Sequence, residues 1–482
     1  MPTRAEPRLT HLGYESSISW TDDLPVCKQA GVGYSTNQLY REDGHRREDH
    51  PFEDASIHCR MNDTCLYGVF DGHNGVQTAA FALQSLASEI LFDPKLHTKT
   101  TDDEVREFLR QAFVAVERSY LKSFDDKLAE RTSLSYEIPD GLKVYEAYQK
   151  YPEIVNKLNA INNELSCGTT AVIALVLNNH LFVANVGDSR ALLCKTDKNG
   201  VLRVIQLSVD HDLSNEDELL RLYNLGLPFE KVAHGYRLGN QENTRCLGNY
   251  LVKGAYKEFE ELAQASSEPI TAEPEIHGGI LLDESCRFLL LMSDGLYRSL
   301  EATGIDHDQV NKEIAQMVTT EFRVQSTLTG VAQAVVDKVV RKHHDMFMSG
   351  GGGASAGQGI RDDITLLVRN FNFPLPHAPA SHGTPSPNMP PDPTAATNQL
   401  PWFVDRVATG GGGATSSEDG AESQLNDTNT STATSTTTST STAPPTNNDS
   451  DKRIKPYVDF SDFFRNVEKA KLEGCLPEEI EF

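Results

Sequence analysis

The sequence predicts an α+β fold in which antiparallel sheets are covered by helices and followed by a disordered tail. Apolar strand-like runs are joined by short links that suit hairpins, and helical patterns come in blocks. Apolar runs stop near Phe373, after which Pro, Gly, Ser, Thr and Asn dominate until about Lys455. A chain of 482 residues, 38% of them hydrophobic, can bury a sizeable core, but this tail cannot offset its own chain entropy. We therefore expect one folded body and a tail.

The first elements carry clear local signals. Residues 65–70 (CLYGVF) form an apolar run that ends in an Asp-Gly turn, which predicts a strand. Small and apolar residues recur at helical spacing over 76–91, which predicts a helix. Thr101 and Glu104 predict a capping box at the start of a second helix. The buried stripe of this helix is expected to contain Phe108, Ala112, Phe113, Val116 and Tyr120.

Two hairpins follow. Residues 170–177 (TAVIALVL) and 181–186 (LFVANV) are joined by an Asn-Asn-His link that suits positive φ angles. A second hairpin is predicted to pair 191–195 with 201–207. Beyond it, periodicity predicts a helix over 216–225, a strand over 288–292, a long helix over 331–347 and a strand over 364–368.

Charge and cysteine content exclude several classes of function. The formal charge of −25 argues against a nucleic-acid partner and suits a protein that gathers cations, although acidity for solubility alone is an alternative. The eight cysteines are scattered without a CxxC pair, which favours reduced thiols over a zinc site. No run approaches the roughly 20 apolar residues that span a bilayer. We expect a cytoplasmic protein with no membrane partner.

The tail itself has two parts. Its Pro-rich and then Ser/Thr-rich composition predicts a flexible tether. Apolar residues return after it, spaced along one face of a short helix that Asp459 could cap and Gly474 could end. That face comprises Phe460, Phe463, Phe464 and Val467.

Five acidic motifs combine into a candidate metal site. Each alone is typical of a plain turn, but carboxylate oxygens are the ligands that Mg²⁺ and Mn²⁺ prefer. In this order they resemble the PPM family of metal-dependent protein phosphatases, whose motifs are ED, DGHxG, GDSR, SDG and DN. The matching residues here are FED at 52–54, DGHNG at 71–75, GDSR at 187–190, SDG at 293–295 and DD at 362–363. The resemblance covers about residues 31–369 and implies two antiparallel sheets packed face to face with helices outside.

The resemblance also implies a mechanism, the hydrolysis of phosphoserine and phosphothreonine by water held between two metal ions. A third, weaker ion would bind at Asp188, and His73 would be the general acid for the leaving oxygen. The implied ligands of the two main ions are Asp71 as the bridge, Glu53 and the Gly72 carbonyl on one ion, and Asp294 and Asp362 on the other.

Two positions depart from the family pattern. The phosphate-binding arginine is expected four residues before Glu53, but Asp49 stands there. Arg41 could replace it if the segment that follows is an insertion, and Arg46 and Arg47 are alternatives. The second departure is Asp363 in place of Asn, which would either tighten metal binding or only face water.

The rest of the chain resembles one subgroup of that family, the proteins that bind and activate the TGF-beta-activated kinase. The resemblance lies in residues 19–27, 215–227, 273–278, 332–339 and, above all, PYVDFSDFF at 456–464. It implies a TGF-beta-activated MAP kinase kinase kinase as partner, with a stress-activated MAP kinase and a phosphoprotein substrate as further partners. The motifs leave two interpretations of the domain open, an active phosphatase and a catalytically inactive scaffold.

These interpretations divide the chain into an N-terminal extension (1–30), a phosphatase domain (31–370), a disordered linker (371–455) and a kinase-docking helix (456–474). The residues predicted to contact the kinase are Tyr457, Val458, Phe460, Phe463, Phe464 and Val467.

Overall fold

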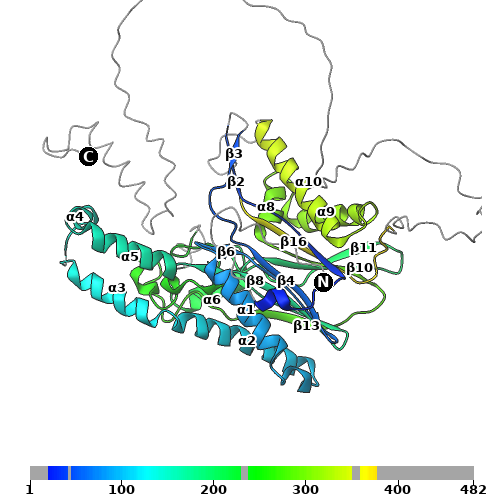
Figure 1. Cartoon of the computed structure of the whole chain (residues 1–482), viewed down its shortest axis with the longest axis horizontal. Coiled ribbons are helices and arrows are strands. Elements are labelled where there is room, and N and C mark those ends of the chain that lie inside the picture. Colours follow the sequence, from blue (N-terminus) through cyan, green and yellow to red (C-terminus); the bar gives the residue numbers. More distant parts are fainter. Residues whose placement is uncertain (1–19, 42–44, 140, 229–236, 350–358, 377–482) are drawn as a thin grey trace, which may run out of the picture. The chain divides into compact units, whose positions relative to one another are not determined.

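Two five-stranded antiparallel sheets form the centre of the structure, a computed structural model that describes residues 20–41, 45–139, 141–228, 237–349 and 359–376 (Figure 1). The first sheet has the order β13-β9-β8-β5-β4 and the second the order β1-β16-β14-β10-β11. The strands of the first are β4 (Ala55–Met61), β5 (Thr64–Phe70), β8 (Ala171–Leu177), β9 (His180–Val186) and β13 (Glu275–Leu281). Those of the second are β1 (Ala30–Ser35), β10 (Arg190–Thr196), β11 (Leu202–Gln206), β14 (Cys286–Met292) and β16 (Ile364–Asn370).

Both predicted hairpins are confirmed. Strands β8 and β9 pair in antiparallel register, and Asn178 and Asn179 in their turn have φ angles of 50° and 63°. Asparagine tolerates this left-handed conformation better than most side chains do. Strands β10 and β11 form the second hairpin.

The two sheets bury a shared core, which explains why β8 is apolar at every position. Its residues Val172, Ala174 and Val176 face the second sheet, where they pack with residues such as Leu291. The alternate residues of β8 belong instead to the core beneath the helices that cover the first sheet. Because side chains of a strand alternate between its faces, a strand between two layers must be apolar on both.

Helices cover the outer face of each sheet (Figure 1). Helices α1 (Gln77–Leu91) and α2 (Asp102–Lys122) pack on the first sheet, and the predicted capping box of α2 is present. Helices α8 (Asp294–Glu301), α9 (His307–Phe322) and α10 (Leu328–Met348) pack on the second. A Cβ at Gly31 or Gly33 would lie 2.2 or 2.4 Å from the α10 backbone, so only glycine lets β1 approach this helix so closely.

Smaller elements complete the fold. Helices α3 (Asp125–Glu137), α4 (Val144–Lys150) and α5 (Pro152–Leu165) lie together, and sequence patterning did not identify them. Their apolar stripes are sparse, and α3 buries only Leu134 among its described residues. One three-stranded sheet consists of β6 (Gly72–His73), β7 (Gly168–Thr169) and β12 (Leu247–Gly248). Another consists of β2 (Gln38–Tyr40), β3 (Arg46–Arg47) and β15 (Ile360–Arg361). The described residues also include helix α6 (Glu216–Asn224).

Core packing extends past both predicted ends of the domain. Cys27 is buried between the two sheets. Phe373 stacks on Phe322 with ring centroids 4.7 Å apart, and Leu375 packs against the same core. The predicted linker begins at 371, so its first residues, which include Phe373 and Leu375, belong to the folded domain. The rest of the predicted linker and the docking helix lie outside the described residues.

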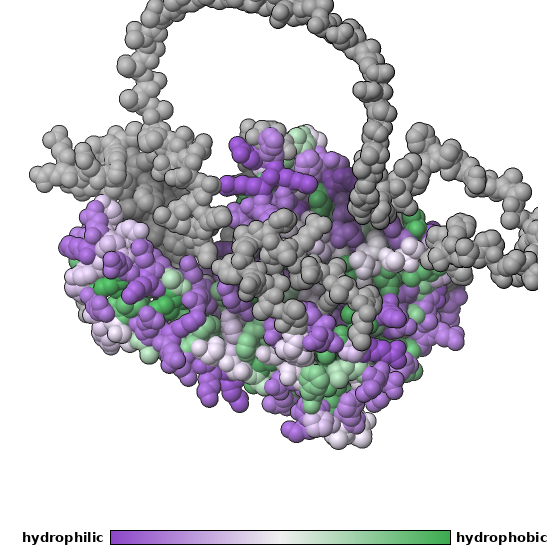
Figure 2. Space-filling model, in the orientation of Figure 1, coloured by the Kyte–Doolittle hydropathy of each residue, from purple (hydrophilic) through white to green (hydrophobic). Residues whose placement is uncertain are grey.

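Figure 2 shows one face on which apolar residues are scattered among more numerous hydrophilic ones. Among the described helices, none is long and apolar enough to cross a bilayer.

Candidate metal centre

The five acidic motifs meet because each lies at a strand end on the same edge of the two sheets. Strand β5 ends at Phe70, opposite Ala55 at the start of β4, so the motifs at 71–72 and 53–54 are neighbours. In the other sheet, Met292 at the end of β14 lies opposite Arg190, the first residue of β10. Antiparallel pairing therefore brings together side chains that are far apart in the sequence.

Two glycines allow the loops to touch. A Cβ at Gly72 would lie 2.6 Å from the carbonyl oxygen of Glu53. A Cβ at Gly295 would lie 1.9 Å from the carbonyl oxygen of Asp363. These distances leave no room for a side chain, so the glycines after Asp71 and Asp294 are required by packing.

Asp71 lies at the centre of the acidic group. Its carbonyl oxygen accepts hydrogen bonds from Thr170 N (2.9 Å) and Thr169 Oγ1 (3.0 Å), which fix the loop. The backbone N–H of Asp294 approaches its Oδ2 at 3.4 Å. Burial, and then the charges of neighbouring carboxylates beginning with Asp54, hold the pKa of Asp71 well above its usual range.

The other carboxylates share this environment. Burial raises the pKa of Glu53 to about 7, although nearby His50 opposes the shift. Burial likewise raises the pKa of Asp294 to about 7 against the attraction of Arg298. Asp54 accepts a hydrogen bond from Ser293 Oγ (2.8 Å), while its Oδ1 is buried without a hydrogen-bond partner.

Asp363 does not face water, so that alternative is wrong. It is 3% exposed, and its carboxylate accepts hydrogen bonds from Asn37 N (2.6 Å), Asn37 Nδ2 (2.9 Å) and Glu53 N (2.8 Å). The carboxylate therefore ties the loop that carries Glu53 to the start of β16.

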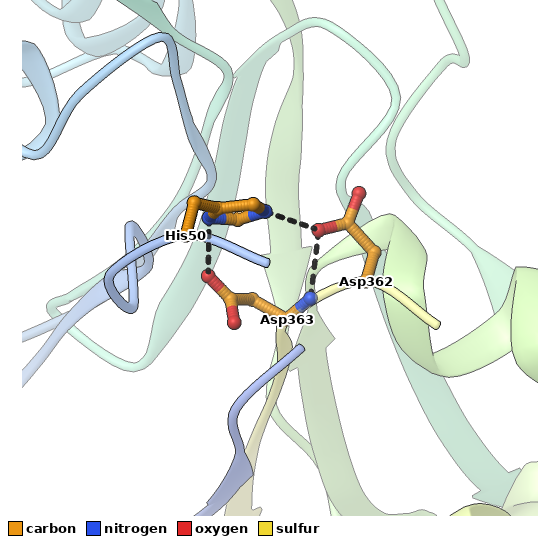
Figure 3. Close-up of side chains that lie close together, drawn as sticks. All are labelled: His50, Asp362 and Asp363. Atoms are coloured by element: carbon orange, nitrogen blue, oxygen red, sulfur yellow. Dashed lines mark hydrogen bonds and ion pairs between the residues drawn. The ribbon is translucent and has the colours of Figure 1, made fainter. Parts of the chain in front are cut away.

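His50 joins the site, and sequence reasoning missed it (Figure 3). Its Nε2 lies 3.9 Å from Asp362 Oδ1, and its Nδ1 lies 3.9 Å from Asp363 Oδ2. These three side chains are close enough to hold one metal ion together. Burial would lower the pKa of His50, but the charges of Glu53 and the two aspartates raise it. The one available signal was its position beside Asp49, where the family pattern places a cation.

The arginines proposed to bind phosphate lie on or beside the small sheet β15-β2-β3. Arg41, Arg46 and Arg47 are all exposed to solvent. The choice among them stays a prediction. The basic side chain found within 4.0 Å of Glu53 is His50.

His73 lies on β6 and packs tightly against β7. A Cβ at Gly168 would lie 2.2 Å from its Nε2, which is buried without a hydrogen-bond partner. Burial and the positive charge of Lys253 lower the pKa of His73 to about 4. The imidazole is therefore neutral near pH 7 and would donate a proton only after gaining one.

Asp188, predicted to bind a third ion, is 1% exposed and already has two partners. Asn243 Nδ2 donates to its Oδ1 (3.1 Å), and Arg298 Nη2 donates to its Oδ2 (2.6 Å). Arg298 Nε also contacts Asp294 Oδ2 at 2.8 Å. This arginine was not identified from the sequence, although its spacing of four residues after Asp294 places both on one helical face.

The acidic side chains of the site other than Asp188 and Asp363 form a set of ligands that fits divalent cations. Five acidic side chains gather at this edge, and burial, together with repulsion between neighbouring carboxylates, raises the pKa values of four of them. Their oxygens are hard ligands of the kind that Mg²⁺ and Mn²⁺ bind, and Asp54 keeps an unpartnered one. The members are Glu53, Asp54, Asp71, Asp294 and Asp362.

Comparisons with known proteins agree with this fold. Residues 122–344 match the family described as Protein phosphatase 2C. The chain is 30% identical over 318 residues to Probable protein phosphatase 2C 2 of Paramecium tetraurelia, covering 66% of this chain and 87% of that protein. The chain therefore belongs to the protein phosphatase 2C family, which is metal-dependent in general.

Another relative has a name that points to signalling. The TGF-beta-activated kinase 1 and MAP3K7-binding protein 1 of Caenorhabditis elegans is 27% identical over 328 residues, covering 68% of this chain and 77% of that protein. Among solved structures, the serine-threonine phosphatase 2C from Toxoplasma gondii matches with a TM-score of 0.41 and 18% identity, covering 72% of this chain and 96% of that one.

Proposed function

We propose that this protein is an adaptor and activator of a TGF-beta-activated MAP kinase kinase kinase, built on a phosphatase domain that hydrolyses phosphoserine and phosphothreonine esters. One observation supports the catalytic part above all others: Asp71, Asp294 and Glu53 converge with too little positive charge of their own. Bound Mg²⁺ or Mn²⁺ supplies the missing charge, the Lewis acid and the activation of water that phosphate-ester hydrolysis requires.

The chain's own residues have separate tasks in this proposal. Asp71 would bridge two ions, with Glu53 and the Gly72 carbonyl on one and Asp294 and Asp362 on the other. Asp363 keeps Glu53 in place through the backbone N–H of that residue (2.8 Å). Because His73 is neutral near pH 7, it would act as an acid only if substrate binding raised its pKa.

Hydrolysis of a phosphothreonine peptide by the full chain, followed across a Mn²⁺ titration, tests the catalytic part. Asp71→Asn should lower turnover at least 100-fold, since it removes a charge shared by two ions. Asp345→Asn is the matched control, because Asp345 is 74% exposed at the end of α10. Equal turnover in the two variants would refute the assigned bridge.

The adaptor part rests on the PYVDFSDFF segment and on the name of the Caenorhabditis elegans relative. An aromatic helical face on a long tether suits docking into a groove on a kinase domain. Phe464→Ala in the full chain should weaken binding to the kinase catalytic domain at least tenfold, while Lys469→Ala should leave it within twofold. Calorimetric titration measures both, and equal affinities would contradict the docking helix.

A scaffold without catalytic activity is the second candidate. The low pKa of His73 and the engagement of Asp188 and Asp294 by Arg298 favour it. Kinase activation by Asp71→Asn at the wild-type level, with no phosphate release from the wild type in millimolar Mn²⁺, would establish this alternative.

A further inference from the structure

The cation already present among the acidic motifs is Arg298, in the second turn of α8. Its guanidinium contacts three carboxylates: Asp188 Oδ2 at 2.6 Å, Asp294 Oδ2 at 2.8 Å and Glu242 Oε2 at 3.2 Å. Two of these, Asp188 and Asp294, are residues that the motifs assign to metal ions. The charges of Asp294 and Asp188 in turn raise the pKa of Arg298, so the side chain stays charged at any pH at which the protein folds.

The surroundings hold this arginine in place. Tyr297, next to it on α8, donates its hydroxyl to the Asp188 carbonyl at 3.1 Å. The guanidinium of Arg190 lies 3.6 Å from the centroid of the Tyr297 ring, and Arg190 is itself paired with Asp210 at 2.7 Å. The start of α8, the helix that carries Arg298, is thereby joined to the loop that carries Asp188.

A metal ion and this guanidinium compete for the same oxygens. An ion shared by Asp188 and Asp294 needs carboxylate oxygens at roughly 2.0–2.6 Å and would meet a fixed positive charge there. On the other side of the centre, the basic side chain within 4.0 Å of Glu53 is His50, and the charges that act on Asp71 are those of other carboxylates. The two sides of one acidic group therefore obtain positive charge differently.

We infer that Arg298 is a built-in cation that fills the third-ion position at Asp188, so that this chain binds one divalent ion fewer than its carboxylates alone would hold. The inference rests on the proposed metal centre, since it concerns which positions of that centre hold a metal ion and which one holds the Arg298 guanidinium. It also gives Asp188 a role other than metal binding: Asp188 is the buried counterion that orients Arg298 toward Asp294.

Native mass spectrometry of the full chain across a Mn²⁺ titration tests this directly. Arg298→Gln should bind one more Mn²⁺ than the wild type, and Arg298→Lys, which keeps the charge, should bind the wild-type number. The matched control is Arg203→Gln, which disrupts a pair with Asp197 at 3.2 Å on an exposed part of β11. Adding Asp188→Asn to Arg298→Gln should abolish the additional ion.

Melting temperatures in EDTA give a second measurement. Without metal, the melting temperature of Arg298→Gln should lie several degrees below that of the wild type. Excess Mn²⁺ should raise the melting temperature of Arg298→Gln more than that of the double variant, which also carries Asp188→Asn. If Arg298→Gln binds the same number of Mn²⁺ ions as the wild type, the inference is overturned.

These results separate the inference from the proposed function. The difference in ion count between Arg298→Gln and the wild type tests the role of Arg298. The absolute count in the wild type, together with its turnover, tests the two-ion centre. A wild type that binds no Mn²⁺ would contradict the catalytic proposal, while one additional ion in the variant would still support the role of Arg298.

Discussion

Two buried acids in this protein, Glu218 and Asp71, have pKa values that are shifted in opposite directions. Glu218 on α6 is 1% exposed, and its carboxylate accepts hydrogen bonds from Arg245 Nη2 (2.5 Å), Arg221 Nη2 (2.8 Å) and Thr244 Oγ1 (2.6 Å). Burial alone would raise its pKa, but these partners lower it to about 2. Asp71, by contrast, is surrounded mainly by other acids, and its pKa rises.

Under the proposed function, the difference separates a structural acid from one that would bind metal. A carboxylate whose neighbours already neutralise it contributes to the stability of the metal-free protein. A carboxylate whose neighbours repel it lowers that stability until a cation arrives. Burial does not distinguish Glu218 from Asp71, whereas the direction of the pKa shift does in this pair.

The largest effect that would sharpen this comparison is expected at Glu218. Glu218→Gln should lower the free energy of unfolding by about 3 kcal/mol, because it leaves the charges of Arg245 and Arg221 partly buried without a counterion. Denaturant unfolding with and without Mn²⁺ measures the loss, which should be the same in both. If excess Mn²⁺ restored the free energy of unfolding of Glu218→Gln, Glu218 would belong to the metal centre instead.

The pH dependence at Glu218 follows from the same contacts. Its pKa in the folded protein, about 2, lies below the ordinary value of 4.5. The unfolded chain therefore binds a proton first as the pH falls, so this stabilisation is present above pH 4.5 and is lost as the pH approaches 2. The stability difference between wild type and Glu218→Gln should shrink over that interval, and a constant difference from pH 7 to pH 3 would contradict the assignment.

Asp71 should behave in the opposite way. In EDTA, Asp71→Asn should raise the free energy of unfolding by about 1–2 kcal/mol, because it removes one of several repelling charges. In Mn²⁺ the wild type should become the more stable protein. Thermal melts of both proteins under the two conditions check this reversal, and a variant less stable than the wild type in EDTA would break the comparison.

The smallest effect is expected at Asp363, which shares features with both groups. Asp363→Asn replaces one acceptor oxygen by an N–H₂ group that must face either Glu53 N or Asn37, at a cost of about 1 kcal/mol. Mn²⁺ should also bind several-fold more weakly, because Glu53 loses its anchor. Calorimetric titration measures the affinity, and an unchanged value would mean that the Glu53 loop is held by other contacts.

Much of the fold could be predicted from local patterns. The hairpin of β8 and β9, the capping box of α2 and the long helix α10 all carry strong signals within a few residues of sequence. Helix α3 could not be found in this way because it buries so little, and the short strands β6 and β7 pair across about 95 residues without a local pattern.

The site shows the same difference between features with a local sequence signal and features that depend on long-range contacts. The acidic motifs were visible because each is a short run of residues, and three of them combine a carboxylate with a glycine that the structure requires. His50, Arg298 and the anchoring role of Asp363 were not, since each depends on contacts made across the fold. Sequence patterns thus indicated the acidic side chains of the site better than the groups that surround them.

The hydrogen bond between Asp363 and Glu53 N has a consequence for the order of events during synthesis. It joins residues 310 positions apart, and the bond from Asn37 to Asp363 spans 326. Contacts of such long range form late, since loop closure must precede them. A nascent chain would expose the acidic motifs at 53–54, 71, 188 and 294 before the last motif, Asp362 and Asp363, leaves the ribosome. Tight metal binding would then report that β16 has entered the second sheet, so acquisition of the ions would mark the completion of folding.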